Sequence, residues 1–177
     1  ETGEESNTWI AHQNAVLDIA FSPDGNRLVT GGKDHMVRVW DWRTAETQWI
    51  GVGHVGAVGL VSFHPRGELV ISTGTSEHPR HYKQTDGAIR LWDATSGEQI
   101  QPGSHQDSHM ISIAMTTDGE RVVGARGNRT LSVWDSKSGD WVGEVNNLTP
   151  GPKPLAVSPD DRVLAVVSGG DRKSTRL

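Results

Sequence analysis

Three segments decide the fold, MVRVWD (36–41), AIRLWD (88–93) and TLSVWD (130–135), and each of them ends in Trp-Asp. Each is preceded by the same order of signals: a histidine, an apolar run, a turn, a second apolar run and a Gly-rich stretch. A unit repeated at about forty residues is one supersecondary module that cannot bury its faces alone. The sequence therefore predicts an array of repeated units, and it directs the question of function to a surface rather than to a catalytic cleft.

The first unit shows the pattern most completely. Its apolar run VLDIAF (16–21) is typical of a strand covered on both faces. The turn SPDG (22–25) follows, with proline and glycine where a type I turn favours them. Four strands are expected in this unit, at 16–21, 27–32, 36–41 and 43–50.

The remaining units repeat this order with decreasing fidelity. Residues 2–12 also parallel residues 95–105, so the chain is expected to begin within the outer strand of a preceding unit. The expected organisation is one repeat region over 1–177, divided into an outer strand at 1–11, repeat 1 at 12–53, repeat 2 at 54–104, repeat 3 at 105–147 and an incomplete repeat 4 at 148–177.

These coupled features resemble the WD-repeat β-propeller family over essentially the whole chain. The resemblance implies an all-β fold in which each repeat is a blade, a four-stranded antiparallel sheet, and the blades pack around a central channel. Propellers of this family usually have more than four blades, so we expect an open partial propeller of four blades. Its edges would pair with missing blades of the same chain or with a second copy.

The resemblance also implies a structural tetrad in each blade, made of Trp, Ser or Thr, His and Asp. A buried indole N–H needs an acceptor, a hydroxyl supplies it, a histidine meets the hydroxyl, and an aspartate orients the histidine. Thr73 is an alternative to Ser72 in the second unit, and in the third Asn128 and Gly124 replace the acid and the hydroxyl. The expected members are His12, Thr30, Asp34 and Trp40 in the first unit, His54, Ser72, Asp86 and Trp92 in the second, and His105 and Trp134 in the third.

The second unit carries an insertion, TSEHPRHYKQT (75–85), between its second and third strands. In the resembling family this connection opens onto the face where partners dock, and loops on a rigid scaffold often carry binding residues. The alternative is a solvated loop without a partner. Two histidines without a third ligand do not make a metal site. The candidate partner-binding residues are His78, Arg80, His81, Tyr82 and Lys83.

Several classes of function are disfavoured by composition and motif context. The net charge of −5 argues against a nucleic-acid surface, and no apolar run approaches a membrane span. GVGHVG (51–56) matches a dinucleotide-binding pattern but is followed by a predicted strand instead of a helix, so no cofactor is expected. The absence of cysteine fits a reducing compartment, and we expect a cytoplasmic location.

The sequence thus favours a non-catalytic protein-interaction scaffold within a larger protein, with protein partners and no catalytic residues. One alternative is an enzymatic or ligand-binding propeller with a site in its central channel, for which Asp18 is the one carboxylate at a suitable position. Another is a structural β-array of a large surface protein. Trp9, Trp49 and Trp141 lie on predicted outer strands and are expected to cover blade edges.

The last seven residues, DRKSTRL (171–177), have two interpretations. They match what a common sequencing-library adapter encodes in one reading frame, which is the origin we favour. Alternatively they form the third strand of the fourth unit, although they are far more polar than MVRVWD, AIRLWD and TLSVWD.

Overall fold

The structure is a computed structural model of the chain, and it describes residues 8–75, 89–102, 110–126, 129–146, 153–167 and 172–176. In these residues the chain forms antiparallel sheets that follow one another in sequence. The first sheet contains β1 (Val16–Phe21), β2 (Arg27–Gly32), β3 (Met36–Asp41) and β4 (Glu46–Val52), and the second contains β5 (Val58–Phe63), β6 (Leu69–Gly74), β7 (Ile89–Asp93) and β8 (Gln99–Pro102). The third contains β9 (Met110–Met115), β10 (Arg121–Arg126), β11 (Leu131–Asp135) and β12 (Trp141–Val145), and the fourth contains β13 (Lys153–Val157), β14 (Val163–Val167) and β15 (Arg172–Arg176).

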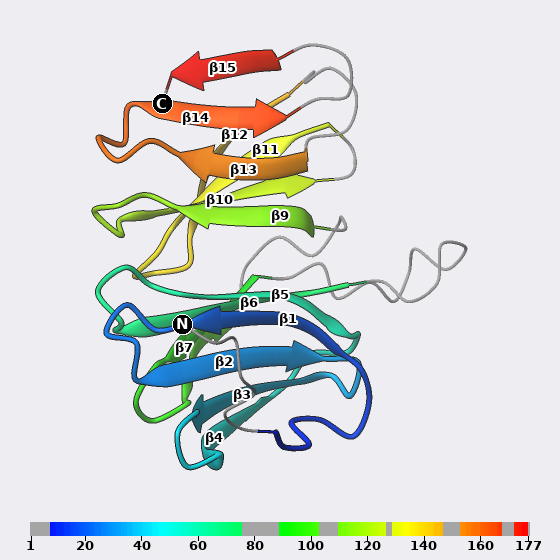
Figure 1. Cartoon of the computed structure of the whole chain (residues 1–177). Helices are drawn as coiled ribbons and strands as arrows, with labels where there is room; N and C mark the ends of the chain where they lie inside the picture. The colour runs from blue at the N-terminus through cyan, green and yellow to red at the C-terminus, as the bar shows by residue number, and fades with distance from the viewer. Residues whose placement is uncertain are drawn as a thin grey trace.

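This architecture confirms the predicted fold class. Within each sheet, neighbouring strands in space are also neighbours in sequence, as expected of blades built from consecutive hairpins. The sheets lie in a row in chain order, with the first and the fourth at opposite ends (Figure 1). β15 pairs with β14 as the third strand of its sheet, with Val163 opposite Arg176 and Val167 opposite Arg172.

The core lies between the sheets, and we call each contact between consecutive sheets a joint. Apolar side chains from the second and third strands of one sheet meet side chains from the first strand of the next. The first joint contains Val29, Val37 and Val39 against Val58, Val61 and Phe63; the second contains Ile71, Ile89 and Leu91 against Met110; the third contains Val123, Ala125 and Leu131 against Leu155 and Val157.

The expectation that β1 is covered on both faces is wrong. Val16, Ile19 and Phe21 are 44%, 56% and 59% exposed, whereas the residues at the same positions of β5, Val58, Val61 and Phe63, are 0%, 4% and 6% exposed. The difference arises because Val58, Val61 and Phe63 of β5 pack against the first sheet, whereas no sheet in the described part of the chain covers Val16, Ile19 and Phe21 of β1. We call the surface formed by Val16, Ile19 and Phe21 the open face.

The outer-strand tryptophans do not all cover edges. Trp49 is buried in the first joint, where its ring stacks on Trp92 at 6.3 Å and its Nε1 donates to the carbonyl of Ala94 at 3.0 Å. Trp9 also contacts a Trp-Asp tryptophan, with its ring tilted by 55° on that of Trp40 and the centroids 6.1 Å apart. Trp141 is partly exposed, as expected of an edge residue. Two of the three side chains therefore contribute to packing between repeats.

No helix in the described part of the chain has the length and the apolar character needed to cross a membrane.

Candidate functional site

The polar network of the first repeat joins four residues that lie far apart in sequence. Trp40 Nε1 donates to Thr30 Oγ1 at 2.9 Å, and His12 Nε2 lies 2.7 Å from the same oxygen. His12 Nδ1 lies 2.7 Å from Asp34 Oδ1. Because the indole is the fixed donor, the chain runs from Trp40 to the hydroxyl, from the hydroxyl to His12 and from His12 Nδ1–H to the carboxylate. Every polar atom of this buried set is thereby satisfied.

Arg38 extends the network and was not anticipated from the sequence. Its Nη1 donates to Asp34 Oδ2 at 2.9 Å and to the carbonyl of Ala11 at 2.7 Å. Burial acts to raise the pKa of Asp34, but the hydrogen bond and charge of His12, the Gln13 N–H and the charge of Arg38 outweigh it, so this pKa is lowered. The ionised carboxylate thus holds residues 11–13 onto the β2–β3 turn.

The second repeat brings together the corresponding residues as far as the structure describes them. Trp92 Nε1 donates to Ser72 Oγ at 2.8 Å, and His54 Nε2 lies 2.7 Å from that oxygen. The hydroxyl is therefore that of Ser72, whereas the Thr73 hydroxyl is buried and makes no hydrogen bond in the described residues. Asp86, the expected acid, lies outside them.

In the third repeat only Trp134 of the expected set falls within the described residues, since His105 and Asn128 lie outside them. Trp134 is buried in the second joint. Gly124 takes the hydroxyl position, and a Cβ there would lie 2.8 Å from Met110 Cε and 2.9 Å from the Trp134 ring. Met110 therefore lies in the space that a hydroxyl side chain occupies in the other repeats, and a larger residue than glycine would have to displace it.

The aspartate of each Trp-Asp pair has a role of its own. Asp93 Oδ1 accepts hydrogen bonds from the backbone N–H groups of Thr95 at 2.9 Å and Ser96 at 2.7 Å. Asp41 and Asp135 cap their turns in the same way. These backbone donors lower the pKa of Asp93 and of Asp135. The cap explains why β4 begins at Glu46 and not at the predicted residue 43.

Hydrogen bonds between turns connect one sheet to the next. In the first joint, Arg27 Nη1 donates to the carbonyl of Ala94 at 2.6 Å, and its Nη2 donates to the carbonyl of Gly67 at 3.0 Å. The guanidinium carbon also lies 5.2 Å from the centre of the Phe63 ring, within range of a cation–π contact. Arg27 thus holds the first sheet to the β5–β6 turn of the second.

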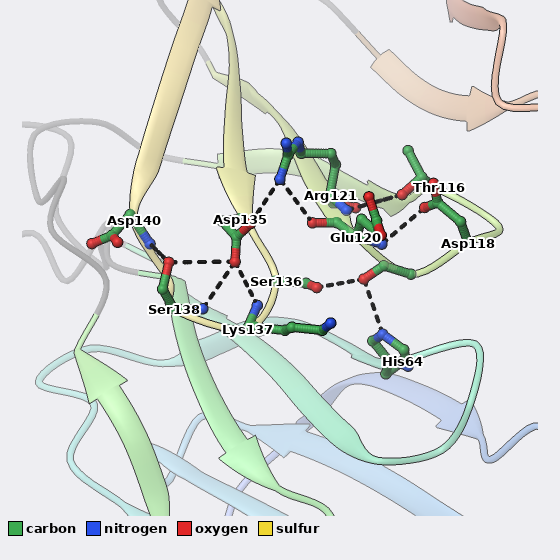
Figure 2. A network of polar contacts seen from close by, with 11 residues as sticks. His64, Thr116, Asp118, Glu120, Arg121, Asp135, Ser136, Lys137, Ser138 and Asp140 are labelled. Atoms are coloured by element: carbon green, nitrogen blue, oxygen red, sulfur yellow. Dashed lines mark hydrogen bonds and ion pairs between the residues drawn. The ribbon is translucent and has the colours of Figure 1, made fainter.

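The second joint uses His64 together with Arg66, whose Nη2 donates to the carbonyl of Asp118 at 3.0 Å. His64 Nε2 donates to the carbonyl of Gly119 at 3.0 Å, while its Nδ1 accepts the backbone N–H of Arg66 at 3.0 Å. The Ser136 hydroxyl donates to the same Gly119 carbonyl (Figure 2). One carbonyl therefore accepts a donor from the preceding repeat and another from its own. Nearby, Arg121 Nη1 pairs with Asp135 Oδ2 at 2.7 Å.

In the third joint the donors again belong to the preceding repeat, but the acceptor in the following repeat is a side-chain carboxylate instead of a backbone carbonyl. Asp161 Oδ1 accepts the backbone N–H of Thr117 at 2.6 Å, and Asp161 Oδ2 accepts the Thr117 hydroxyl and the backbone N–H of Asp118. These donors, the Thr117 hydroxyl first, lower the pKa of Asp161. The acid that anchors this joint therefore comes from the following repeat.

A second kind of bond joins the first strands of consecutive sheets. Asp18 Oδ2 accepts the backbone N–H of Val61 at 2.8 Å, and the Ser112 hydroxyl accepts the N–H of Leu155 at 3.2 Å at the equivalent position. Asp18 thus takes part in the first joint, which is a different role from that of a carboxylate facing a channel. Sequence reasoning missed these bonds because the donors are main-chain groups of another repeat.

The remaining site candidates from the sequence are not part of these networks. The partner-binding candidates fall outside the described residues: His78, Arg80, His81, Tyr82 and Lys83. Beside the open face is a hollow of about 270 Å³ lined by Trp9, Val16, Ile19 and Leu28, with few polar atoms. Within the described residues, no group of three or more His, Asp or Glu side chains could hold a metal ion.

These repeats are similar in sequence to a family model and to several known proteins. The family model of the WD domain, G-beta repeat, matches residues 3–41 and 47–93. The chain is 27% identical over 177 aligned residues to Nuclear distribution protein PAC1 of Arthroderma otae, covering 94% of this chain and 36% of that protein. It is 29% identical to APC/C activator protein CDC20 of Saccharomyces cerevisiae, covering 93% and 28%. Over 78 residues it is 38% identical to Cilia- and flagella-associated protein 52 of Sus scrofa, covering 44% and 11%. The chain spans about a third of the length of the first two relatives.

Proposed function

We propose that this chain, which belongs to the WD-repeat β-propeller family, is a non-catalytic scaffold segment that binds other proteins. The observation that carries the proposal is that the polar side chains of the tetrads are engaged in structural hydrogen bonds. Within the described residues, the tetrad side chains that could perform acid–base chemistry are engaged in hydrogen bonds inside their own repeat; these are His12, Thr30, Asp34, His54 and Ser72. We therefore assign function to the surface of the stacked sheets.

The printed names of the relatives agree with such a role at a coarse level. One relative is named as an activator of the APC/C and another as a nuclear distribution protein. Neither name describes a substrate or a chemical reaction. We extend to this chain only the general idea of acting through contacts with other proteins, at a cytoplasmic location.

The open face supports the further proposal that the stack continues in a larger propeller. Val16, Ile19 and Phe21 are exposed, although the residues at the same positions of the next repeat are buried by a neighbouring sheet. An exposed apolar sheet face of this kind marks an interaction surface. A blade of the same longer chain, or one from a second copy, would cover it.

For recognition of a separate partner, we propose the insertion at residues 75–85. Arg80 and Tyr82 belong to the residue types that most often anchor interfaces. In sequence the insertion lies between β6 and β7, and both of these strands are largely buried in the second sheet. A rigid base reduces the entropy lost when a loop binds.

The test is quantitative affinity capture from cell extract with three versions of the chain. The natural chain is compared with an Arg80→Ala, Tyr82→Ala variant and with a control variant, Glu46→Ala, Gln48→Ala, which alters exposed residues of the outer strand β4. We expect the loop variant to retain a captured protein at least about tenfold more weakly, as for loss of an interface anchor, and the control to match the natural chain. Equal capture by all three would contradict the loop assignment, and no specific capture by the natural chain would contradict the scaffold role.

A further inference from the structure

The first joint provides a template for what the open face binds. The second sheet contributes three groups to this joint: the Phe63 ring at the end of an apolar strand, the carbonyl of Gly67 in the following turn, and the carbonyl of Ala94 directly after Trp-Asp. Arg27 of the preceding sheet contacts all three groups, with its guanidinium over the ring and one hydrogen bond to each carbonyl.

The first sheet carries the same three groups at the open face. Phe21 stands where Phe63 stands, Gly25 where Gly67 stands and Trp42 where Ala94 stands, as the spacing from the shared turn and from Trp-Asp shows. Phe21 is 59% exposed, whereas Phe63 is almost completely covered. The open face therefore presents the acceptor half of a joint.

One difference from the template concerns Gly25. Its carbonyl accepts a hydrogen bond from Trp42 Nε1 of its own repeat at 2.9 Å. The second joint shows that such a bond is compatible with a donor from a neighbouring sheet, since the Gly119 carbonyl accepts both Ser136 of its own repeat and His64 of the preceding one (Figure 2). A carbonyl oxygen has two lone pairs, so Gly25 can accept a second donor.

Charge at the open face also suits a cation. In the first joint, Asp93 at the end of the Trp-Asp strand lies close enough to Arg27 for an electrostatic interaction. Asp41 holds the same position in the first sheet, and Asp24 lies in the adjacent turn. Arg43 is engaged with its own repeat, because its guanidinium lies 4.6 Å above the Trp42 ring and its Nη1 donates to Asn26 at 3.1 Å.

We propose that the open face binds a WD-type sheet that carries an arginine at the position equivalent to Arg27, and that this guanidinium lies on Phe21 and donates to the carbonyls of Gly25 and Trp42. The partner is thus a repeat with a valine-rich face and this one basic side chain. The inference rests on the proposed continuation of the stack, and it specifies which kind of repeat can continue it.

The test uses a tandem chain in which a second copy of residues 12–53 is inserted directly before His12. The new junction, Gly53 followed by His12, reproduces the natural step from Gly53 to His54, and it sets Arg27 of the inserted copy against Phe21 of the original first repeat. The readout is amide hydrogen exchange at Ile19 of the original repeat. Ile19 is equivalent to Val61, whose N–H is bound by Asp18 of the preceding sheet.

We expect Ile19 to exchange at least about tenfold more slowly in the tandem chain than in the natural chain, as for a newly buried strand. Arg27→Ala in the inserted copy should remove most of this protection, and Arg27→Lys should restore only part of it because a single ammonium group cannot reach both carbonyls.

Three results would overturn the proposal. These are unchanged exchange at Ile19 in the tandem chain, protection that does not depend on the inserted arginine, and a tandem chain that is unfolded under conditions where the natural chain is folded. Sedimentation of the natural chain is measured in addition. If the natural chain self-associates and Ile19 is protected in the associated form, the open face is covered by a second copy of the chain. None of these readouts depends on protein capture, so a failure of the scaffold proposal can be distinguished from a failure of this one.

Discussion

At the scale of single residues, Asp34 is the acid on which the first network depends. Asp34→Ala would leave the buried His12 Nδ1–H without its acceptor and would remove the carboxylate that pairs with the Arg38 guanidinium. We expect a loss of about 2 kcal/mol in the free energy of unfolding, as for other broken buried networks. That corresponds to a melting temperature lower by roughly 4–8 °C. Thermal unfolding followed by circular dichroism checks this, with Glu46→Ala as an exposed control, and an unchanged midpoint would refute the role assigned to Asp34.

Two adjacent hydroxyls in β6 provide a matched pair. Ser72 accepts the Trp92 N–H and contacts His54, whereas the buried Thr73 hydroxyl makes no hydrogen bond in the described residues. Ser72→Ala should therefore cost about 1–3 kcal/mol, while Thr73→Val should be neutral or stabilising because it removes an unpaired polar group. Denaturant unfolding of both variants measures the difference. The reverse order would show that the hydroxyl in this network belongs to Thr73.

At the scale of elements, the tight turns between the first and second strands of each sheet differ in which atoms lie beside their glycine. Gly25 and Gly119 have φ values of +68° and +75°, so alanine is strained at both, by about 1–2 kcal/mol. A Cβ at Gly119 would also lie 2.3 Å from His64 Nε2, whereas a Cβ at Gly25 meets nothing within 4 Å. We expect Gly119→Ala to be clearly more destabilising than Gly25→Ala in urea unfolding. Equal losses would mean that the His64 contact does not hold the second joint.

The strands illustrate how far a sequence pattern reaches. The spacing between turn and Trp-Asp correctly predicted β1, β2 and β3, because local alternation and turn residues determine where a strand begins and ends. The resemblance to the WD-repeat family implied that Thr30 and Trp40 approach each other, and the structure places Trp40 Nε1 2.9 Å from Thr30 Oγ1. The contacts of Arg27 and His64 were not predicted, because their acceptors are carbonyls whose positions depend on how two separate repeats pack. The exposure of β1 was missed for a related reason, since burial depends on a neighbour and not on the strand's own residues.

At the scale of the whole molecule, aspartates in turns and networks link stability to pH. The pKa of Asp24 is lowered to about 2 by the Ser22 hydroxyl and the Asn26 N–H, and those of Asp34, Asp93 and Asp161 are also lowered. A lowered folded-state pKa stabilises the fold fully above the unfolded value, near 3.9, and this contribution is lost as the pH falls through the folded value. The contribution of these groups to the melting temperature should be constant above about pH 5 and should fall between about pH 4 and pH 2. Scans across this range test the expectation, and a midpoint that stays level down to pH 2 would contradict it.

The central claim is that successive repeats form equivalent joints and that the open face is the half of a joint without its neighbour. Amide hydrogen exchange of the natural chain tests this most directly, by comparing β1 with β5, two strands that occupy the same place in consecutive sheets. β5 packs between two sheets and its Val61 N–H donates to Asp18, whereas β1 is exposed on one face. The account predicts much slower exchange for residues 58–63 than for residues 16–21. Equal exchange in the two strands, or slower exchange in residues 16–21, would contradict it.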